Sequence, residues 1–141
     1  MTGTLALVLV GGARVEHVAL TSSFAEVAHH PAALWVALPP ASAVARWLAA
    51  HERLTLVVLA AGQRALARAC ADAGDGVPAA LAALPRGDGH FAVAGALSST
   101  HGRVTARESV GDQALFLVAI DAADLDPATV GGAPLLAEVP A

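Results

Sequence analysis

Short apolar runs separated by glycine or proline pairs dominate the first forty residues. The run at 4–10 is rich in Val and Leu and stops at a Gly-Gly pair. Such a pair between apolar runs is typical of a tight hairpin, so we expect strands over 4–10 and 13–20. A third run, 33–38, ends at a Pro-Pro pair, because proline has no N–H to donate to a neighbouring strand.

The middle of the chain changes to helical spacing. Ser42 can cap a helix over 44–51, where apolar and aromatic residues recur on one face. The short length and the branched residues of 54–59 predict a buried strand. A second helix is expected over 63–73. The segment after it is loose and rich in glycine, with room for a short helix over 79–84.

The last third returns to apolar alternation. Gly111 and Asp112 are typical of the turn in a hairpin. The expected elements are strands over 90–94, 99–109 and 113–120, an acidic loop over 121–132, and a short terminal strand or extension over 133–139.

This order of elements is not a regular alternation of strands and helices. It predicts a small antiparallel β-barrel with helices inserted at its edge, which is a mainly β or α+β fold. The chain has 141 residues, the length of one domain, and can bury a core without disulfides. We therefore expect a single domain over residues 1–141.

Composition narrows the classes of partner. With 56% hydrophobic and 14% charged residues, the chain has little charge to cover a monomer, and we expect a homodimer. All eight basic residues are Arg, which excludes Schiff-base chemistry and a lysine-dependent phosphate loop. The net charge of −4 without a basic stripe argues against nucleic acid.

The cysteine, the histidines and the apolar runs indicate where the protein is expected and whether it binds a metal or a membrane. Cys70 is the single cysteine, which fits a reducing cytoplasm, where we expect the protein. The histidines do not have metal-ligand spacing, so no metal site is predicted. The apolar runs fall short of the roughly 18 residues that span a bilayer, so we expect no membrane partner.

Two groups of polar residues are candidate binding sites. Thr21, Ser22 and Ser23 follow a strand and can hold a phosphate or the polar edge of a ring, or they can cap their own turn. Ser42 precedes a helix, with Arg46 one turn beyond, and can favour an anion or be an ordinary cap.

Two enzyme classes are disfavoured. His101 follows three hydroxyl residues at 98–100, but neighbours in sequence do not make a catalytic triad. The nucleophile elbow G-x-S-x-G and the glycine fingerprint of a Rossmann fold are both missing from the sequence.

The segment 21–31, read as T-S-S-F-A-E-V-A-H-H-P, resembles a segment of the flavin reductase-like FMN-binding split-barrel family. Further similarity follows in the same order as in that family, and the resemblance covers about residues 4–136. The matching segments are the strand 34–38, the turn at Ser42, the strand 54–59, Gln63 with Leu66 and Ala67, the turn 111–113, and the Pro-Leu-Leu at 134–136.

The resemblance implies a homodimeric split barrel that binds FMN, or FAD, near the subunit interface. Thr21, Ser22 and Ser23 are then expected to contact the flavin. Pro39 and Ser42 are expected to line its phosphate end, with Arg46 adding positive charge. The implied reaction is hydride transfer from NAD(P)H to the flavin, with reduced flavin passed to a partner oxygenase. The sequence identifies no catalytic acid or base.

Several residues depart from the family pattern. His30 replaces an Asp, Ala32 a second Pro, Val57 an Asn and Gln113 a His, and each change is expected to remove a contact of the family pattern. Two alternatives therefore stay open. One is a pyridoxamine-phosphate-oxidase-like barrel that binds FMN or coenzyme F420, and the other is a degenerate barrel that acts as a non-catalytic interaction module.

Overall fold

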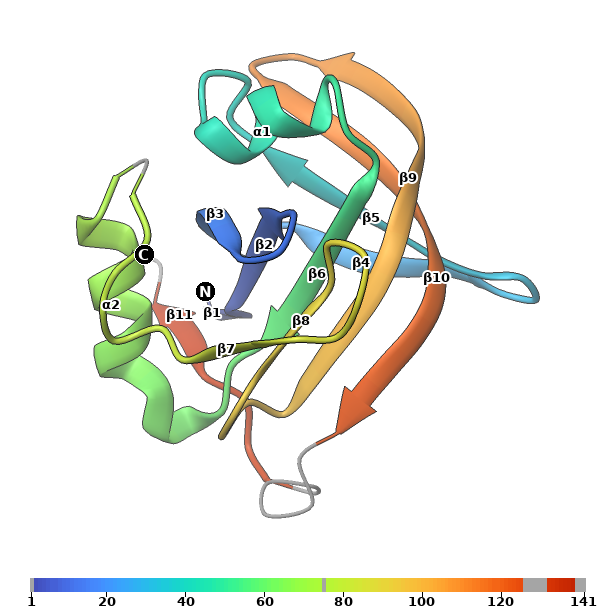
Figure 1. Cartoon of the computed structure of the whole chain (residues 1–141). Coiled ribbons are helices and arrows are strands. Elements are labelled where there is room, and N and C mark those ends of the chain that lie inside the picture. The colour runs from blue at the N-terminus through green and yellow to red at the C-terminus, as the bar shows by residue number, and fades with distance from the viewer. Residues whose placement is uncertain (1, 75, 126–131, 139–141) are drawn as a thin grey trace.

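A computed structural model of the chain describes residues 2–74, 76–125 and 132–138. The helices are α1 (Ala43–Leu48), the 3-10 turn η1 (Ala61–Gln63) and α2 (Arg64–Asp72) (Figure 1). The strands are β1 (Thr2–Thr4), β2 (Ala6–Gly11), β3 (Val15–Thr21), β4 (Phe24–His29), β5 (Ala32–Leu38), β6 (Arg53–Val58), β7 (Ala83–Pro85), β8 (Phe91–Val93), β9 (Ser98–Val110), β10 (Gln113–Leu125) and β11 (Leu136–Glu138).

Seven strands form one antiparallel sheet in the order β3-β2-β6-β9-β10-β5-β4. The sheet curls until the end of β3 meets β5. There the Thr21 hydroxyl donates to the Ala37 carbonyl at 3.3 Å, and the Ala37 amide donates to the Ser23 carbonyl at 2.9 Å. The predicted mainly β, antiparallel barrel is therefore confirmed, with two helices at its edges (Figure 1).

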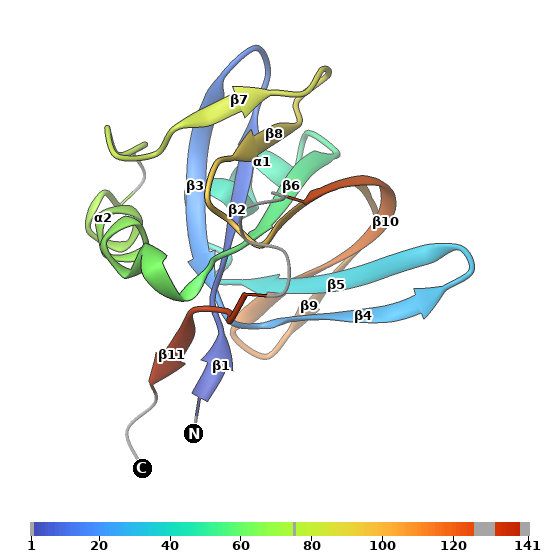
Figure 2. The same cartoon turned by 90° about the horizontal axis from the view of Figure 1, so that it is seen from below.

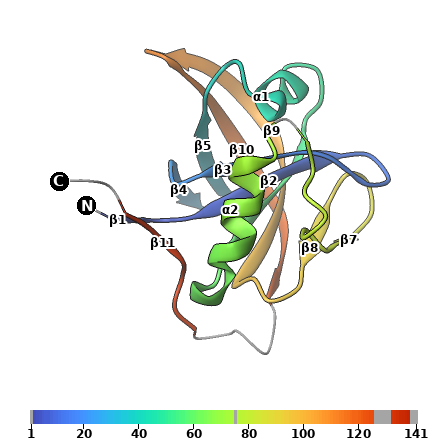
Figure 3. The same ribbon diagram turned by 90° about the vertical axis from the view of Figure 1, so that its left-hand side faces the viewer.

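Both faces of β2 are buried, which explains why its sequence is a continuous apolar run rather than an alternating one. Ala6, Val8 and Val10 point into a core that Leu48 of α1 closes. The intervening Leu7 and Leu9 belong to a second core, which contains residues of α2 and β8. Figure 3 shows α2 lying in front of β2, on the side of this second core.

Helix α1 is shorter than the sequence predicts. Ser42 is its N-cap, as expected, and accepts a hydrogen bond from the Ala45 amide at 3.2 Å. The helix ends at Leu48 instead of continuing to His51, and Arg107 of β9 binds the carbonyls at this end. Its guanidinium donates to the carbonyl of Leu48 at 2.7 Å and to that of His51 at 3.3 Å.

Three further segments differ from the sequence prediction. Residues 24–29 form strand β4, which pairs with β5 in a projecting hairpin (Figure 2). The segment F-A-E-V-A-H has no regular alternation of apolar and polar residues, so its sequence does not indicate a strand. Residues 79–84 do not form a helix; β7 begins at Ala83 and pairs with β8. The expected loop at 121–132 starts as strand, since β10 runs to Leu125, and residues 126–131 lie outside the described residues.

Most of the remaining elements follow the prediction, but the terminal strand is shorter: β11 covers only Leu136–Glu138 of the expected 133–139, and residue 139 lies outside the described residues. Gly111 adopts a positive φ of 59° in the turn between β9 and β10, as its hairpin motif predicts. Gly102 stands where two strands approach most closely. A Cβ there would lie 2.5 Å from Cγ1 of Val118 and 2.6 Å from the Ala119 carbonyl oxygen, so this position requires glycine.

Candidate functional site

The first predicted group, Thr21–Ser23, joins the end of β3 to the start of β4. The Thr21 side chain is 8% exposed, and its oxygen also accepts the Ser23 amide at 3.0 Å. Thr21 thus supports its own turn. Ser22 and Ser23 are exposed, and within the described part of the chain neither hydroxyl has a hydrogen-bond partner in the protein.

The second predicted group, Pro39–Arg46, leads from β5 into α1. Pro39 is exposed, and its carbonyl accepts the Ser42 amide at 3.0 Å. The Ser42 oxygen caps the helix, but its own O–H is still able to donate. The Arg46 guanidinium folds back toward the helix start and donates to the carbonyl of Ala41. Positive charge and a hydroxyl therefore gather at one end of α1.

The barrel brings these two groups toward each other. Thr21 is bonded to Ala37, which lies only two residues before Pro39. Each predicted residue therefore lies at the junction of β3, β5 and the start of α1, the end of β3 that is remote from the β2–β3 hairpin. The two groups are far apart in the sequence, but they lie close together in the fold, as the parts of a single binding site must.

A buried polar network lies elsewhere, and sequence reasoning missed it. The Thr55 side-chain oxygen of β6 accepts the Phe91 amide at 3.0 Å and is 3.2 Å from Nδ1 of His101. Nε2 of His101 is 2.9 Å from the carboxylate of Asp124, to which Arg86 donates at 3.3 Å. The bond from His101, followed by the charge of Arg86, lowers the pKa of Asp124.

These bonds define one consistent direction of donation. Because Thr55 accepts from an amide, its own proton points to Nδ1 of His101, and Nε2 of His101 then donates to Asp124. The order hydroxyl, imidazole, carboxylate matches that of a hydrolase triad. However, Thr55 is 0% exposed, so no substrate can reach its hydroxyl, and the network instead holds β8 against β6 and β9.

The signal for this network was present in the sequence. In the sequence, His101 directly follows three hydroxyl residues, but direct neighbours in a strand point to opposite faces, whereas residues two apart share a face. Ser99 and His101 are two apart in β9, and both are buried. Ser99 accepts the Val93 amide at 3.4 Å, so β8 is held at two points, by Ser99 of β9 and by Thr55 of β6.

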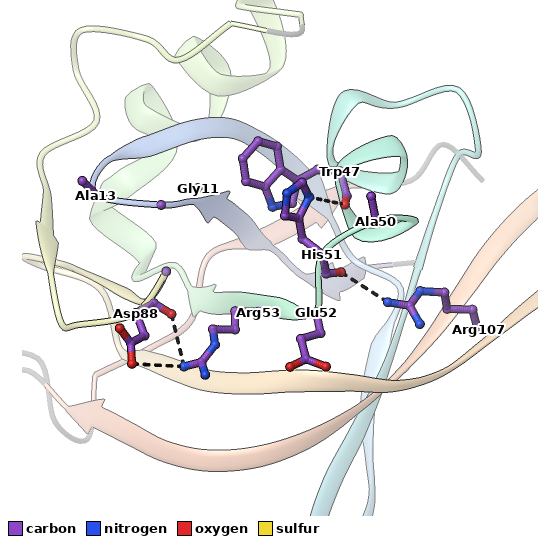
Figure 4. A pocket seen from close by; sticks show the side chains of 11 residues that line it. Gly11, Ala13, Trp47, Ala50, His51, Glu52, Arg53, Asp88 and Arg107 are labelled. Carbon is purple, nitrogen blue, oxygen red and sulfur yellow. Dashed lines mark hydrogen bonds and ion pairs between the residues drawn. The ribbon is translucent and has the colours of Figure 1, made fainter.

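A further pocket lies at the opposite end of β3 (Figure 4). Its cavity volume is about 970 Å³. It opens between the β2–β3 hairpin, the end of α1, the start of β6 and the turn before β8. The side chains that matter most for its chemistry are Trp47, His51, Glu52, Arg53, Asp88 and Arg107.

Two features are missing from residues 2–74, 76–125 and 132–138. In these ranges no group of three or more His, Cys, Asp or Glu side chains gathers in a way that could hold a metal ion. No helix in them is long and apolar enough to cross a membrane.

Comparison with known families decides what kind of domain this is. The model of the flavin reductase like domain matches residues 1–138. The chain belongs to the flavin reductase-like family. The resemblance seen in the sequence is thereby confirmed. A search of curated protein sequences found no match for this flavin reductase-like chain.

Solved structures of flavin reductases share its fold. The NADH:FAD oxidoreductase SgcE6 of Streptomyces globisporus matches with 23% identity over 96% of this chain and 76% of that one, at a TM-score of 0.83. The flavin reductase PheA2 matches with 16% identity over 96% and 85% at 0.82. The styrene monooxygenase flavin reductase of Pseudomonas putida matches with 20% identity over 96% and 86% at 0.78. At these identities the likeness concerns the fold.

Proposed function

We propose that this flavin reductase-like domain binds FMN, or alternatively FAD, and transfers hydride to it from NAD(P)H. The observation that carries the proposal is the pair of exposed hydroxyls at Ser22 and Ser23, which have no partner in the described part of the protein. They lie at the same junction as Ser42 and Arg46. Membership of the family supports a flavin as the ligand, and a structure of SgcE6 is described as a complex with NAD and FAD fragments.

The residues at this junction fit a flavin in their chemistry. The polar edge of a flavin ring contains both acceptors and a donor, and a serine hydroxyl can donate and accept. Ser22 and Ser23 would therefore hold the ring edge. The phosphate needs donors and positive charge, which the O–H of Ser42 and the guanidinium of Arg46 supply. Thr21 would act indirectly, by fixing the turn that presents the two serines.

The bound flavin would supply the hydride-accepting chemistry. The part of this chain is to bind and orient: Ser22 and Ser23 set the position of the ring, and Ser42 with Arg46 sets the phosphate. Orientation alone contributes substantially to rate, because it converts a bimolecular encounter into a positioned one. We assign no general acid or base. By analogy with the styrene monooxygenase flavin reductase, we propose that reduced flavin passes to a partner oxygenase.

Paired variants test this assignment. Replacing both Ser22 and Ser23 by Ala should abolish retention of FMN, whereas Thr105→Ala, which removes an exposed hydroxyl of β9, should leave it unchanged. Arg46→Ala should weaken FMN more than riboflavin, which lacks the phosphate, and Arg68→Ala on α2 is the matched control. Retention of FMN by the double serine variant, or equal losses for FMN and riboflavin, would contradict the respective assignment.

We also propose a homodimer, formed through the outer face of β5, β9 and β10. That face has an apolar hollow of about 400 Å³, lined in part by Trp35, Leu115 and Leu117. Leu117 is 38% exposed, and together with Trp35 and Leu115 it forms a contiguous apolar surface of the kind that a second chain covers. Sedimentation should give twice the 14.0 kDa monomer mass, and Leu117→Glu should give the monomer while Val77→Glu should not. A monomeric wild-type protein would contradict this part.

One alternative has an observation in its favour. Thr21 and Ser42 already bond within the protein, which is what a degenerate barrel serving as a non-catalytic interaction module would show. Failure of the protein to bind flavin even with excess FMN would support that alternative. The match to the flavin reductase like domain favours the reductase over a pyridoxamine-phosphate-oxidase-like barrel. A cytoplasmic location stays a prediction.

A further inference from the structure

The large pocket of Figure 4 is separate from the proposed flavin site. It opens beside the β2–β3 hairpin at the start of β3, whereas Thr21 ends that strand. It also meets α1 at Trp47, near the C-terminal end of the helix, whereas Ser42 caps the N-terminal end. A cavity volume of about 970 Å³ is within the size range of small-molecule sites.

An aromatic platform forms one wall of the pocket. The rings of Trp47 and His51 stack with centroids 4.1 Å apart and planes 18° apart. The His17 ring packs edge-on against Trp47 at 5.7 Å, and Nδ1 of His51 is 3.0 Å from the Trp47 carbonyl oxygen. The His51 ring is thus held in place while its side chain is exposed to the pocket. A fixed aromatic face favours a planar ligand that stacks on it.

Some of the charged side chains around this platform have hydrogen-bond or ion-pair partners in the protein, and one does not. Arg53 pairs with the Asp88 carboxylate at 3.6 Å, and Arg107 donates to the carbonyls of Leu48 and His51. The Glu52 carboxylate also lines the pocket, yet among the described residues nothing forms an ion pair or hydrogen bond with it.

The nearby Arg103 does not form an ion pair with Glu52. Arg103 feels the charge of Glu52 but is bound to Asp121, with its Nε 3.2 Å from the carboxylate. The exposed Glu52 carboxylate is hydrated in the absence of a ligand, and a ligand that displaces this water has to offer a donor in its place, because a carboxylate only accepts hydrogen bonds. A planar ring with an amino group provides both the stacking face and that donor.

We propose that this pocket binds a planar heteroaromatic ring that carries an amino group, adenine being the simplest example. The ring stacks on His51, and its amino group faces Glu52. The site does not depend on the proposed flavin function, because the ring of FMN has no exocyclic amino group. NADH, FAD and free nucleosides share the adenine ring, so the probe is adenosine itself, and FMN tests the other site.

Equilibrium dialysis with labelled adenosine tests the site in the full chain. Adenosine should bind saturably, and inosine, which has a carbonyl in place of the amino group, should bind more weakly. His51→Ala should weaken adenosine about tenfold, the loss expected for one stacking contact. Glu52→Gln should remove the preference for adenosine over inosine. His29→Ala, at an exposed histidine of β4, is the matched control and should change nothing.

Fluorescence gives an independent readout, because the chain has only two tryptophans. In a Trp35→Phe background, adenosine should quench Trp47, and His51→Phe, which keeps an aromatic ring, should preserve binding even if His51→Ala does not fold. Displacement of adenosine by NADH or FAD would name the larger ligand, and displacement by neither would indicate a free nucleoside; each result supports the site. The proposal is overturned if adenosine shows no saturable binding, or if inosine binds equally well.

Discussion

Removing one buried hydroxyl at Thr55 should destabilise the whole barrel. Threonine and valine have nearly the same shape and both are branched at Cβ, so Thr55→Val keeps the packing and the strand preference of β6. What it removes is the oxygen at the centre of the network. That oxygen accepts the Phe91 amide at 3.0 Å and lies 3.2 Å from Nδ1 of His101.

The magnitude follows from counting the groups left without partners. Thr55 is 0% exposed and His101 is 5% exposed, so water cannot replace the lost hydroxyl. The Phe91 amide and Nδ1 of His101 would each be buried without a partner, at a cost of about 1–3 kcal/mol apiece. Valine recovers a little by burying a methyl group. We therefore expect the free energy of unfolding to fall by about 2–4 kcal/mol.

Urea unfolding monitored by circular dichroism measures this change directly. Thr105→Val is the matched control, because Thr105 is exposed on β9 and should tolerate the substitution within about 0.5 kcal/mol. Native-state hydrogen exchange adds a local test, since the Phe91 amide should exchange faster in Thr55→Val. If Thr55→Val unfolds at the same urea concentration as the wild type, the network does not hold β8 and our account of it is wrong.

Two further stability predictions follow from the same region of the sheet. Gly102→Ala should destabilise by about 1–3 kcal/mol, because its Cβ would overlap Val118 and the Ala119 carbonyl, whereas Gly12→Ala meets no atom within 4 Å and should be neutral in the same urea assay. The hydrogen bond from His101, followed by Arg86, lowers the pKa of Asp124 below its ordinary value of 3.8. The ionised Asp124 therefore stabilises the folded state fully above pH 3.8, and this stabilisation disappears as the pH falls through the lower pKa of the folded protein. The difference in stability between wild type and Asp124→Asn should therefore shrink on acidification through that range, and a constant difference would refute the assignment.

Local signals in the sequence were sufficient for most of the barrel. The Gly-Gly and Gly-Asp turns, the proline pair and the Ser42 cap are chemical features of single residues, and each appears where it was predicted. Prediction failed where pairing across the sheet decides the outcome. Strand β4 exists because β5 lies beside it, and β10 continues to Leu125 because β9 pairs with it up to Ser98.

The candidate sites show the same division. A cluster contiguous in sequence, such as Thr21–Ser23, can be proposed from the sequence alone, and in the fold it lies beside the Pro39 turn through a contact with Ala37. Its role in binding stays a prediction. Thr55, His101 and Asp124 come from three strands, so only their register brings them together. The stack of Trp47 on His51 forms at the end of α1, where Arg107 of a distant strand binds the Leu48 carbonyl, and no local signal in the sequence marks that contact.

Retention of FMN tests the central claim most directly. The purified protein is mixed with FMN, passed through gel filtration, and its absorbance spectrum is recorded beside that of the Ser22→Ala, Ser23→Ala double variant and the Thr105→Ala control. We predict that oxidised-flavin bands elute with the wild type and the control, that NADH or NADPH bleaches them, and that the double variant elutes colourless. A wild-type protein that elutes without flavin, or a double variant that retains it, would contradict the account.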